Sequence, residues 1–220
     1  MGFHMDLQQL KALVKRGEGA TLEFKLKASH PEKIVREIVA FANSAGGFLL
    51  VGVGDDKTVP GLKFVEEDEY ILVKAIEKYC FPAIPYRIER VAVTDEREVL
   101  VLEVMKSPQS PHFVVQDFDN NTGKVYVRVE DKSVQASREL RQILKGVAKR
   151  RSVRFQYGEK ERVLMQYLAS HPRITVEEFS KAASIPRNVA SRTLVLLVLA
   201  NVIRIQPHEV QDFFAVVTAS

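Results

Sequence analysis

The sequence predicts an α+β protein built from a mixed α/β domain and a smaller helical domain that ends in a β-hairpin. In the first two thirds of the chain, an apolar stripe at helical spacing precedes a continuous apolar run typical of a buried strand. Several later segments alternate like paired strands. Near the end of the chain, three helical segments precede two short strands. At roughly 100–200 residues per domain, the chain of 220 residues accommodates both domains.

Capping residues and glycines set the limits of the elements in the first domain. Asp6 is placed to cap the first helix, and Ser29 with Glu32 three residues later forms a capping box for the second. The pair Gly46-Gly47 ends that second helix. The elements predicted in chain order are a helix over 6–16, a strand over 21–25, a helix over 29–43, a strand over 48–53, a helix over 66–79, strands over 86–93, 99–105, 113–115 and 124–129, and a closing helix over 135–145.

The last third of the chain has the element order of a winged helix-turn-helix. Thr175 and Glu178 form a second capping box, and Pro186 suits the first turn of the helix that follows. The predicted elements are helices over 159–171, 175–183 and 186–200 and strands over 202–206 and 212–217. From the change in composition, we place the first domain at 5–146, a basic linker at 147–158 and the winged helix-turn-helix domain at 159–220.

Composition excludes several classes of protein. Hydrophobic residues make up 46% and charged residues 27% of the chain, which excludes collagen-like and disordered chains. No apolar run approaches the roughly 20 residues that a membrane-spanning helix needs, and the first residues show no export signal. The single cysteine, Cys80, cannot form an internal disulfide. We therefore expect a cytoplasmic protein with no membrane partner.

The net charge of +4 is unevenly distributed. Residues 1–146 carry 21 basic and 22 acidic side chains, whereas residues 147–220 carry 11 basic and 6 acidic ones. The densest basic run includes Lys149, Arg150 and Arg151 and falls in the predicted linker. Such a run is either a solvated connector or part of a phosphate-binding surface. Both alternatives are consistent with the sequence.

The helix that begins near residue 186 is the candidate recognition helix. In a helix-turn-helix, this helix enters the major groove and its first residues reach the base edges. We expect its exposed positions to be Arg187, Asn188, Ser191 and Arg192, and we expect Arg204 on the hairpin to contact the backbone. Arginine and asparagine can pair bidentately with guanine and adenine. The alternative is a winged helix that makes protein contacts instead.

The remaining positions of this helix are apolar. The positions expected to pack inward are Val189, Leu194, Leu196, Leu197 and Val198. The run from Leu194 to Leu199 is nevertheless more apolar than a monomeric domain of this kind needs. We therefore expect part of the helix to lie in a homodimer interface.

The most distinctive residues lie between Glu18 and Gly61. In order, they are Glu18, Glu23-Phe24-Lys25, Phe41-Ala42-Asn43 with Gly46-Gly47, and Gly52-Val53 followed by Asp55-Asp56. With these blocks and Val125 to Arg128, residues 10–146 resemble the Schlafen/AlbA-type domain, which is also described as a divergent AAA-type ATP-binding or transcriptional-regulator domain. The chain departs from the family pattern at Glu130 to Ser133, where the family has a Gly-Ser turn. The resemblance implies a DNA-binding regulator with a C-terminal winged helix.

Carboxylates in these blocks indicate a second possible function. Glu18, Glu23 and either Asp55 or Asp56 flank two strands that could be neighbours, and such oxygen ligands suit Mg²⁺ or Mn²⁺. Lys25 could then stabilise charge on a phosphate. In Schlafen proteins a comparable acidic triad supports endoribonuclease activity, and the resemblance places it on the same carboxylates. The structural alternative is that Glu23 pairs with Lys25 and that the two aspartates are turn residues.

The glycine-rich blocks do not predict an ATP site. A phosphate loop of the type Gly-x-x-x-x-Gly-Lys-Ser/Thr is missing from the sequence. Gly46-Gly47 and Gly52 to Gly54 instead fall at a helix end and a strand end. The sequence therefore predicts a nucleic-acid-binding transcriptional regulator, with duplex DNA as the expected partner and RNA as the alternative. The competing hypothesis is a metal-dependent endoribonuclease whose only cofactor is Mg²⁺ or Mn²⁺.

Overall fold

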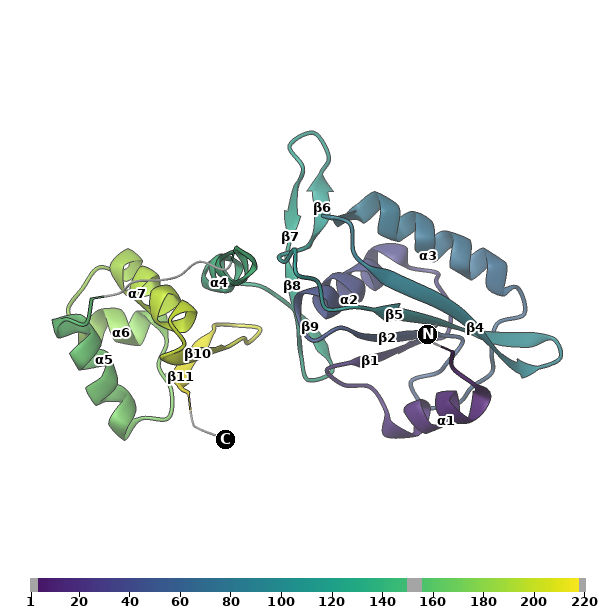
Figure 1. The fold of residues 1–220 in the computed structure, drawn as a ribbon, viewed down its shortest axis with the longest axis horizontal. Helices are drawn as coiled ribbons and strands as arrows, with labels where there is room; N and C mark the ends of the chain where they lie inside the picture. The colour runs from purple at the N-terminus through teal and green to yellow at the C-terminus, as the bar shows by residue number, and fades with distance from the viewer. Residues whose placement is uncertain (1–3, 150–155, 218–220) are drawn as a thin grey trace. The chain divides into compact units, whose positions relative to one another are not determined.

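The computed structural model describes residues 4–149 and 156–217, and this part of the chain divides into two units (Figure 1). The first unit covers residues 1–135 and the second covers residues 136–220. The mixture of helices and sheets in this structure confirms the predicted α+β class. In the described residues, no helix is both long enough and apolar enough to cross a bilayer.

The first unit is organised around a mixed sheet. Its strands are β1 (Leu22–Lys25), β2 (Gly47–Val51), β5 (Arg97–Val104) and β4 (Tyr86–Thr94), in that spatial order. β1 and β2 are parallel because the helix α2 (Pro31–Asn43) connects them, as a parallel crossover requires. β5 is antiparallel to both β2 and β4. The carboxyl ends of β1 and β2 therefore lie at the same edge of the sheet.

Helices cover both faces of this sheet (Figure 1). α2 and α3 (Val65–Tyr79) pack on one face, where Leu49 and Val51 belong to the same apolar core. α1 (Leu7–Arg16) packs on the other face, where Leu50 and Phe24 are fully buried. Successive side chains of a strand point to opposite faces. The continuous apolar run predicted as a buried strand is thus explained by burial on both sides of β2.

The later strands differ in part from the predicted ones, which were strands over 113–115 and 124–129 that pair with each other. β6 (Phe113–Asp117) pairs with β3 (Cys80–Phe81) and with β7 (Thr122–Lys124). β8 (Tyr126–Val129) instead pairs with β9 (Lys132–Gln135), which the sequence analysis did not predict. The predicted strand over 124–129 is therefore two strands in different sheets. Burial raises the pKa of the Cys80 thiol to about 12, so this cysteine is a protonated core residue.

The second unit contains the predicted helices and hairpin in the predicted order. They are α4 (Arg138–Ala148), α5 (Glu159–Ser170), α6 (Val176–Ala182), α7 (Arg187–Leu199), β10 (Ile203–Gln206) and β11 (Phe213–Val216). Phe179 of α6, Leu194 of α7 and Phe214 of β11 meet in one apolar core. The capping box of Thr175 and Glu178 is present at the start of α6. Ser184, with φ of 52°, lies in the turn between α6 and α7.

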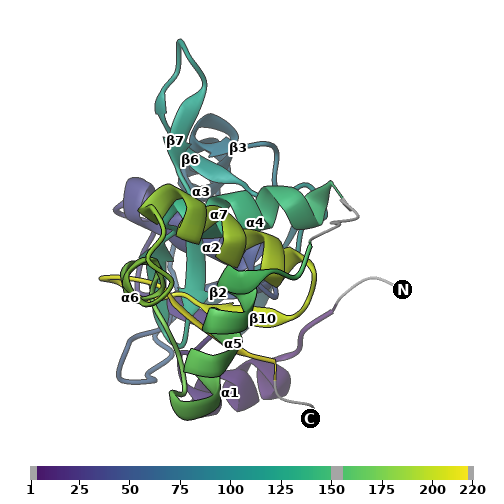
Figure 2. The ribbon, with the colours of Figure 1, turned by 90° about the vertical axis from the view of Figure 1, so that its left-hand side faces the viewer.

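The division between the units falls before the expected boundary at residue 146. α4, predicted as the closing helix of the first domain, belongs to the second unit and lies alongside α7 (Figure 2). Ser191 Oγ of α7 donates a hydrogen bond to Glu139 of α4 at 2.6 Å. A Cβ atom on Gly146 would come within 2.7 Å of the Leu199 side chain, so the two helices approach closely there. With α4 included, residues 136–220 carry 14 basic and 7 acidic side chains.

Candidate functional site

Three of the predicted carboxylates gather around β1. Glu23 lies within the strand and is only 7% exposed. One of its oxygens accepts a hydrogen bond from Lys25 Nζ, and the other lies 3.1 Å from Arg128 Nη1. Glu18, just before the strand, accepts a hydrogen bond from the Phe24 amide at 2.8 Å. Asp55 follows the neighbouring strand β2 and is exposed.

These carboxylates interact electrostatically. Partial burial is the main cause that raises the pKa of Glu18, although the residue as a whole is exposed. The charges of Glu23 and Asp55 raise this pKa further, while the Phe24 amide and Lys25 oppose the increase. The parallel pairing of β1 and β2 places Lys25 and the loop that carries Asp55 at the same end of the two strands. Glu18 joins them through its hydrogen bond to the Phe24 amide, which holds its carboxylate beside β1.

Asp56 does not join this group. Its Oδ1 accepts hydrogen bonds from the Thr58 hydroxyl at 2.6 Å and from the Thr58 amide at 3.0 Å. These bonds lower the pKa of the exposed Asp56 carboxyl. Asp56 therefore stabilises the turn after β2, as the structural alternative predicted for it. Of the two aspartates that the sequence left open, Asp55 is the one near Glu18.

A buried arginine that the sequence analysis did not assign to the site holds Glu23 in place. The side chain of Arg128 on β8 is only 1% exposed. Its Nη1 pairs with both Glu23 and Glu37 of α2, and its Nη2 donates to the Gly19 carbonyl at 2.7 Å. The guanidinium also lies over the Phe41 ring, 4.9 Å from the centroid. We call this set of contacts the Arg128 network.

The segment that departs from the family pattern closes the same network. Glu130 has a φ of 54°, a conformation that glycine adopts more readily than other residues. The chain then returns along β9, where the Ser133 hydroxyl donates to Glu37 and lies 3.2 Å from Arg128 Nη1. The altered turn therefore keeps a serine within reach of Arg128.

The Asn43 block is a structural element. The Asn43 side-chain amide donates to the carbonyls of His112 at 2.8 Å and Tyr126 at 2.9 Å, and its oxygen accepts from the His112 amide at 2.7 Å. Gly46 has a φ of 81°, and a Cβ atom there would come within 2.7 Å of the Val104 carbonyl oxygen. These residues join α2 to the strands that carry Arg128, and they contact no cavity described below.

The carboxylates as arranged do not fit a divalent cation. Both oxygens of Glu23 are engaged by basic side chains of the chain itself, and one oxygen of Glu18 accepts a backbone amide. Among the described residues, no group of three or more histidine, cysteine, aspartate or glutamate side chains is placed to hold a metal ion. Metal binding by Glu18, Glu23 and Asp55 therefore stays a prediction, and no chemical step is derived from it.

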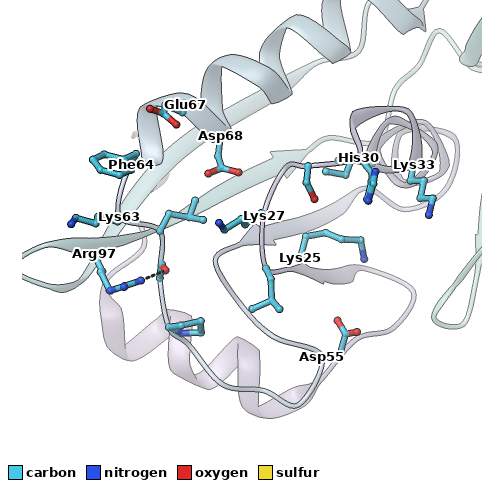
Figure 3. Close-up of a pocket in the computed structure, with 16 residues that line it drawn as sticks. Lys25, Lys27, His30, Lys33, Asp55, Lys63, Phe64, Glu67, Asp68 and Arg97 are labelled. Carbon is cyan, nitrogen blue, oxygen red and sulfur yellow. Dashed lines mark hydrogen bonds between the residues drawn. The ribbon is translucent and has the colours of Figure 1, made fainter.

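A cavity of about 900 Å³ opens beside Asp55 (Figure 3). Its walls come from the loops that follow β1 and β2 and from the first turns of α2 and α3. Figure 3 shows Lys25, Lys33 and His30 on one side, with Asp55 facing them. The lysines of this cavity were not predicted as site residues, apart from Lys25. For Lys27, the signal in the sequence was a basic segment between a strand and the start of the next helix, whereas Lys33 lies within α2 and Lys63 lies just before α3.

The second unit exposes most of the predicted recognition residues. Arg187, Asn188 and Arg192 of α7 are exposed, and Arg204 is exposed on β10. Within the residues that the structure describes, the three guanidinium groups form no hydrogen bond and no ion pair. α7 has no acidic residue in its first turn. These side chains are therefore available to a partner.

Two positions of α7 differ from the prediction. Ser191 was expected on the exposed face, but it is only 8% exposed and its hydroxyl bonds to Glu139. Val189 was expected to pack inward, but it is exposed. Ser191 is buried because α4, which was predicted to belong to the first domain, covers that side of α7. Val189 instead lines an open groove together with Asn188 and Arg192. Because α4 covers Ser191, its hydroxyl is not accessible for a contact with nucleic acid.

α4 also accounts for the apolar surplus of α7. Ile143 of α4 shares a core with Leu194 and Leu197, and Leu199 packs against this core. The apolar run that suggested a dimer interface is thus largely covered within the same unit. The homodimer stays a prediction. Of the predicted basic linker residues, Lys149 is exposed at the end of α4, whereas Arg150 and Arg151 lie outside the described residues.

Comparison with known proteins identifies the family. The chain matches the family described as Schlafen, AlbA_2 over residues 18–137, which is more than half of its length. The chain therefore belongs to this family, and membership indicates a function connected with nucleic acids. The matched range contains the carboxylates around β1 and the whole Arg128 network. None of the curated proteins matches the chain.

One solved structure with similarity to this chain is the crystal structure of the DIP2311 protein from Corynebacterium diphtheriae. The sequences are 19% identical and the TM-score is 0.43. The match covers 64% of this chain and 31% of the other, so it spans about a third of that protein's length.

Proposed function

We propose that the chain is a DNA-binding transcriptional regulator whose second unit is a winged helix-turn-helix. The order of α5, α6, α7, β10 and β11 supports this proposal, since it is the order of helices and wing in that class. α7 would enter the major groove of duplex DNA, and the β10–β11 hairpin would lie against the backbone. The expected partner is duplex DNA, with RNA as the alternative.

The observation that carries the proposal is the set of unpaired cations on α7 and β10. Arg187 and Asn188 stand in the first turn of α7, the part of a recognition helix that reaches base edges. Arg192 follows about one turn later and Arg204 lies on the wing. Exposed arginines with no acidic partner retain their full charge for phosphate or guanine.

Further cations lie next to α7. Lys145, Lys149 and Arg192 line a groove of about 330 Å³ between α4 and α7, and no acidic side chain is among its lining residues. The net charge of residues 136–220 is +7, from 14 basic and 7 acidic side chains. A concentrated positive charge of this kind attracts the phosphate backbone of any nucleic acid. It supports phosphate contacts from α4 as well as from α7.

The proposal is tested by titrating fluorescently labelled duplex DNA with the full chain at several salt concentrations. Arg187→Ala and Arg192→Ala should each weaken binding by about 1–3 kcal/mol if they contact bases, or reduce the salt slope by about 1 if they contact phosphate. Arg162→Ala is the matched control, because Arg162 is an exposed helical arginine whose charge is paired with Glu159. This control should bind as the unaltered chain does.

Two results would contradict the proposal. One is the lack of measurable duplex binding at low salt. The other is an equal loss of affinity in Arg162→Ala and Arg192→Ala, because binding would then follow total charge and not the α7 surface. Tighter binding of folded RNA than of duplex DNA would favour the alternative partner.

The convergence of Glu18, Lys25 and Asp55 supports a second candidate, endoribonuclease activity. The test is incubation of the purified chain with structured RNA, with and without Mn²⁺. Asp55→Asn is the informative variant, because Asp55 is exposed, whereas Glu23→Gln would also disturb the Arg128 network. Cleavage that Asp55→Asn abolishes would support the nuclease. Cleavage that persists in this variant would place the activity elsewhere or in a contaminant.

A further inference from the structure

The exposed large apolar side chains of the first unit gather along α3. Among the described residues of this unit, the large hydrophobic side chains that are exposed are Leu26, Phe64, Tyr70, Ile71, Phe81 and Phe118. Tyr70 and Ile71 lie on α3 itself, whereas Phe64 stands directly before the helix and Phe81 shortly after it. Apolar side chains that gather on one exposed face mark an interaction surface, whereas scattered ones need no explanation.

Tyr70 and Ile71 lie on the outer side of α3. The side chains of Val65, Leu72 and Ile76 are buried in the core of the first unit, so the opposite side of the helix faces outward. There, Tyr70 is 65% exposed and Ile71 is 41% exposed. Figure 1 draws α3 at the periphery of the first unit, with the β6–β7 hairpin beside its carboxyl end. The described part of this unit therefore leaves the middle of the outer face uncovered.

The amino-terminal half of this outer face is acidic. Glu67 lies in the first turn of α3 and is exposed. Its neighbours Glu66 and Glu69 pair with Arg90 at 2.8 and 2.7 Å. The Glu67 carboxylate, in contrast, forms no hydrogen bond or ion pair within the part of the chain that the structure describes. A full negative charge therefore remains available at this end of the face.

The carboxyl-terminal half of the face is basic. Lys74 and Lys78 are exposed about one and two turns after Tyr70. Lys74 Nζ lies 2.8 Å from Glu77, but both side chains are 56% exposed, and a pair of this kind contributes little to stability. Lys78 Nζ lies 5.0 Å from the centroid of the Tyr79 ring and forms no ion pair among the described residues. Both ammonium groups are therefore accessible to a carboxylate of a partner.

The outer face of α3 is complementary to a second copy of itself. We consider two α3 helices packed antiparallel, with a two-fold axis between Tyr70 and Ile71. Glu67 of each copy then stands opposite Lys74 of the other, because the two residues are equally far from the axis along the helix. A two-fold interface requires such a self-complementary patch, in which each contact occurs twice.

We propose that the outer face of α3 is the interface of a homodimer in which two α3 helices pack antiparallel. Tyr70 and Ile71 form its apolar centre. At each end, Phe64 of one copy lies near Lys78 of the other, where the aromatic ring and the ammonium group attract one another. This interface lies in the first unit, unlike the one that the sequence predicted on α7.

The size of this surface predicts a weak dimer. An aromatic side chain contributes roughly 150–250 Å², so covering Phe64, Tyr70 and Ile71 removes on the order of 300 Å² of apolar surface from each copy. Stable interfaces bury about 800 Å² per partner. The dimer should therefore form reversibly and at high protein concentration. Each dimer carries two copies of α7, as do the helix-turn-helix dimers that bind two half-sites.

Sedimentation velocity of the full chain without nucleic acid, over a wide range of protein concentrations, tests the proposal. The unaltered chain should pass reversibly from monomer to dimer. Ile71→Glu should raise the concentration at which half of the chain is dimeric at least about tenfold, because it brings two carboxylates to the two-fold axis. Val210→Glu is the matched control, because Val210 is an apolar residue of the second unit that is 85% exposed. It should leave this midpoint unchanged.

An exchange of charges tests the antiparallel arrangement. Glu67→Lys and Lys74→Glu should each raise the midpoint about fivefold, because each replaces two attractive contacts of the dimer by repulsive ones. The double variant Glu67→Lys/Lys74→Glu should return the midpoint to that of the unaltered chain. Lys11→Glu, at an exposed position of α1, controls for the change in net charge and should have no effect. Circular dichroism checks that each variant is folded.

The proposal is overturned if the chain stays monomeric at every concentration, and the α3 face would then belong to a different protein. It is also overturned if a dimer forms that Ile71→Glu leaves unchanged, or if the double charge variant is as weak as the single ones. These outcomes are independent of the proposed DNA binding, because no nucleic acid is present and the arginines of α7 are unaltered.

Discussion

The two units use arginine in opposite ways. In the first unit, Arg128 is buried and its guanidinium is paired with Glu23, Glu37 and a backbone carbonyl. In the second unit, Arg187 and Arg192 are exposed, and no acidic partner is found for either among the described residues. A buried charge must be paired because desolvation is costly, whereas an exposed charge costs little and remains available. The comparison separates an arginine that holds a fold together from arginines suited to bind a partner.

The two units also differ in net charge, which is negative in the first unit and positive in the second. Residues 1–135 carry 18 basic and 21 acidic side chains, whereas residues 136–220 carry 14 and 7. In the first unit, much of the charge is used internally, and the blocks typical of the family meet in the Arg128 network. In the second unit the excess is positive, and α4, α7 and β10 carry exposed basic side chains such as Lys145, Arg192 and Arg204. Stability should therefore respond to the first set of charges and affinity to the second.

The largest effect should come from removing the buried cation. Arg128→Met should lower the free energy of unfolding by about 3–5 kcal/mol, because the buried Glu23 would keep only Lys25 and the half-buried Glu37 would lose its cationic partner. Denaturant unfolding followed by circular dichroism measures this change. Arg187→Met is the control and should stay within about 0.5 kcal/mol of the unaltered chain. A loss below about 1 kcal/mol for Arg128→Met would break the comparison, since it would mean that the buried network contributes little.

A smaller loss of stability, without a loss of DNA affinity, should result from a substitution at a covered position of α7. Ser191→Ala removes the hydrogen bond to Glu139 and should cost about 1 kcal/mol of unfolding free energy. Duplex affinity should not change, because Ser191 is covered by α4. The same denaturation and titration experiments measure both quantities. An affinity loss comparable to that of Arg192→Ala would restore Ser191 to the binding surface.

Stability of the first unit should also depend on pH through His112. This ring is fully buried, burial lowers its pKa below the usual 6.5, and within the described residues its Nε2 has no hydrogen-bond partner. Below about pH 6.5 the unfolded chain takes up a proton that the folded chain does not. The free energy of unfolding should therefore fall as the pH drops below that value and be flat with respect to this group above it.

Unfolding experiments across this pH range measure the effect. His30→Gln is the control, because His30 is exposed and its substitution should leave the slope unchanged. A free energy of unfolding that rises on acidification through this window would contradict the assignment of a neutral, buried His112.

The smallest effect concerns the turn that departs from the family pattern. Glu130 occupies a left-handed conformation at φ of 54°, which disfavours residues with a Cβ atom. Glu130→Gly should raise the free energy of unfolding by about 0.5 kcal/mol, since the strain outweighs the added freedom of glycine. Denaturant unfolding detects a change of this size with replicate measurements. A clear loss of stability would mean that the Glu130 side chain makes a contribution larger than its backbone strain.

Local signals predicted much of this fold. The cap at Asp6, the capping box at Thr175, the proline at 186 and the apolar run of β2 placed helices and strands close to their observed limits. The capping box predicted at Ser29 and Glu32 was wrong, because α2 begins one residue later, with His30 at the N-cap position and no side-chain cap hydrogen bond.

The place of α4 was harder to predict, because an amphipathic helix does not reveal from its own sequence which domain covers its apolar face. Its contact with α7 shows where it packs, and the burial of Ser191 depends on that contact.

The carboxylates of the candidate site were predicted from the sequence, but the role of Arg128 was not. The positions of Glu18 just before β1, Glu23 within it and Asp55 shortly after the neighbouring strand β2 were enough to indicate that the three lie near one another. The role of Arg128 was not predicted, because its partners lie about a hundred residues earlier in the chain. The available signal was an arginine between two valines in a short apolar strand. An arginine that is buried in such a strand needs a partner of opposite charge.

The most direct test of the central claim measures DNA affinity and stability on the same protein. The variant Arg187→Ala/Arg192→Ala/Arg204→Ala should bind duplex DNA much more weakly, with a salt slope reduced by roughly 2–3, as expected for the loss of about three phosphate contacts. Its free energy of unfolding should remain within about 0.5 kcal/mol of that of the unaltered chain for each substitution. A variant that keeps the original affinity and salt slope would contradict the account, because the exposed arginines would then not form the DNA-binding surface.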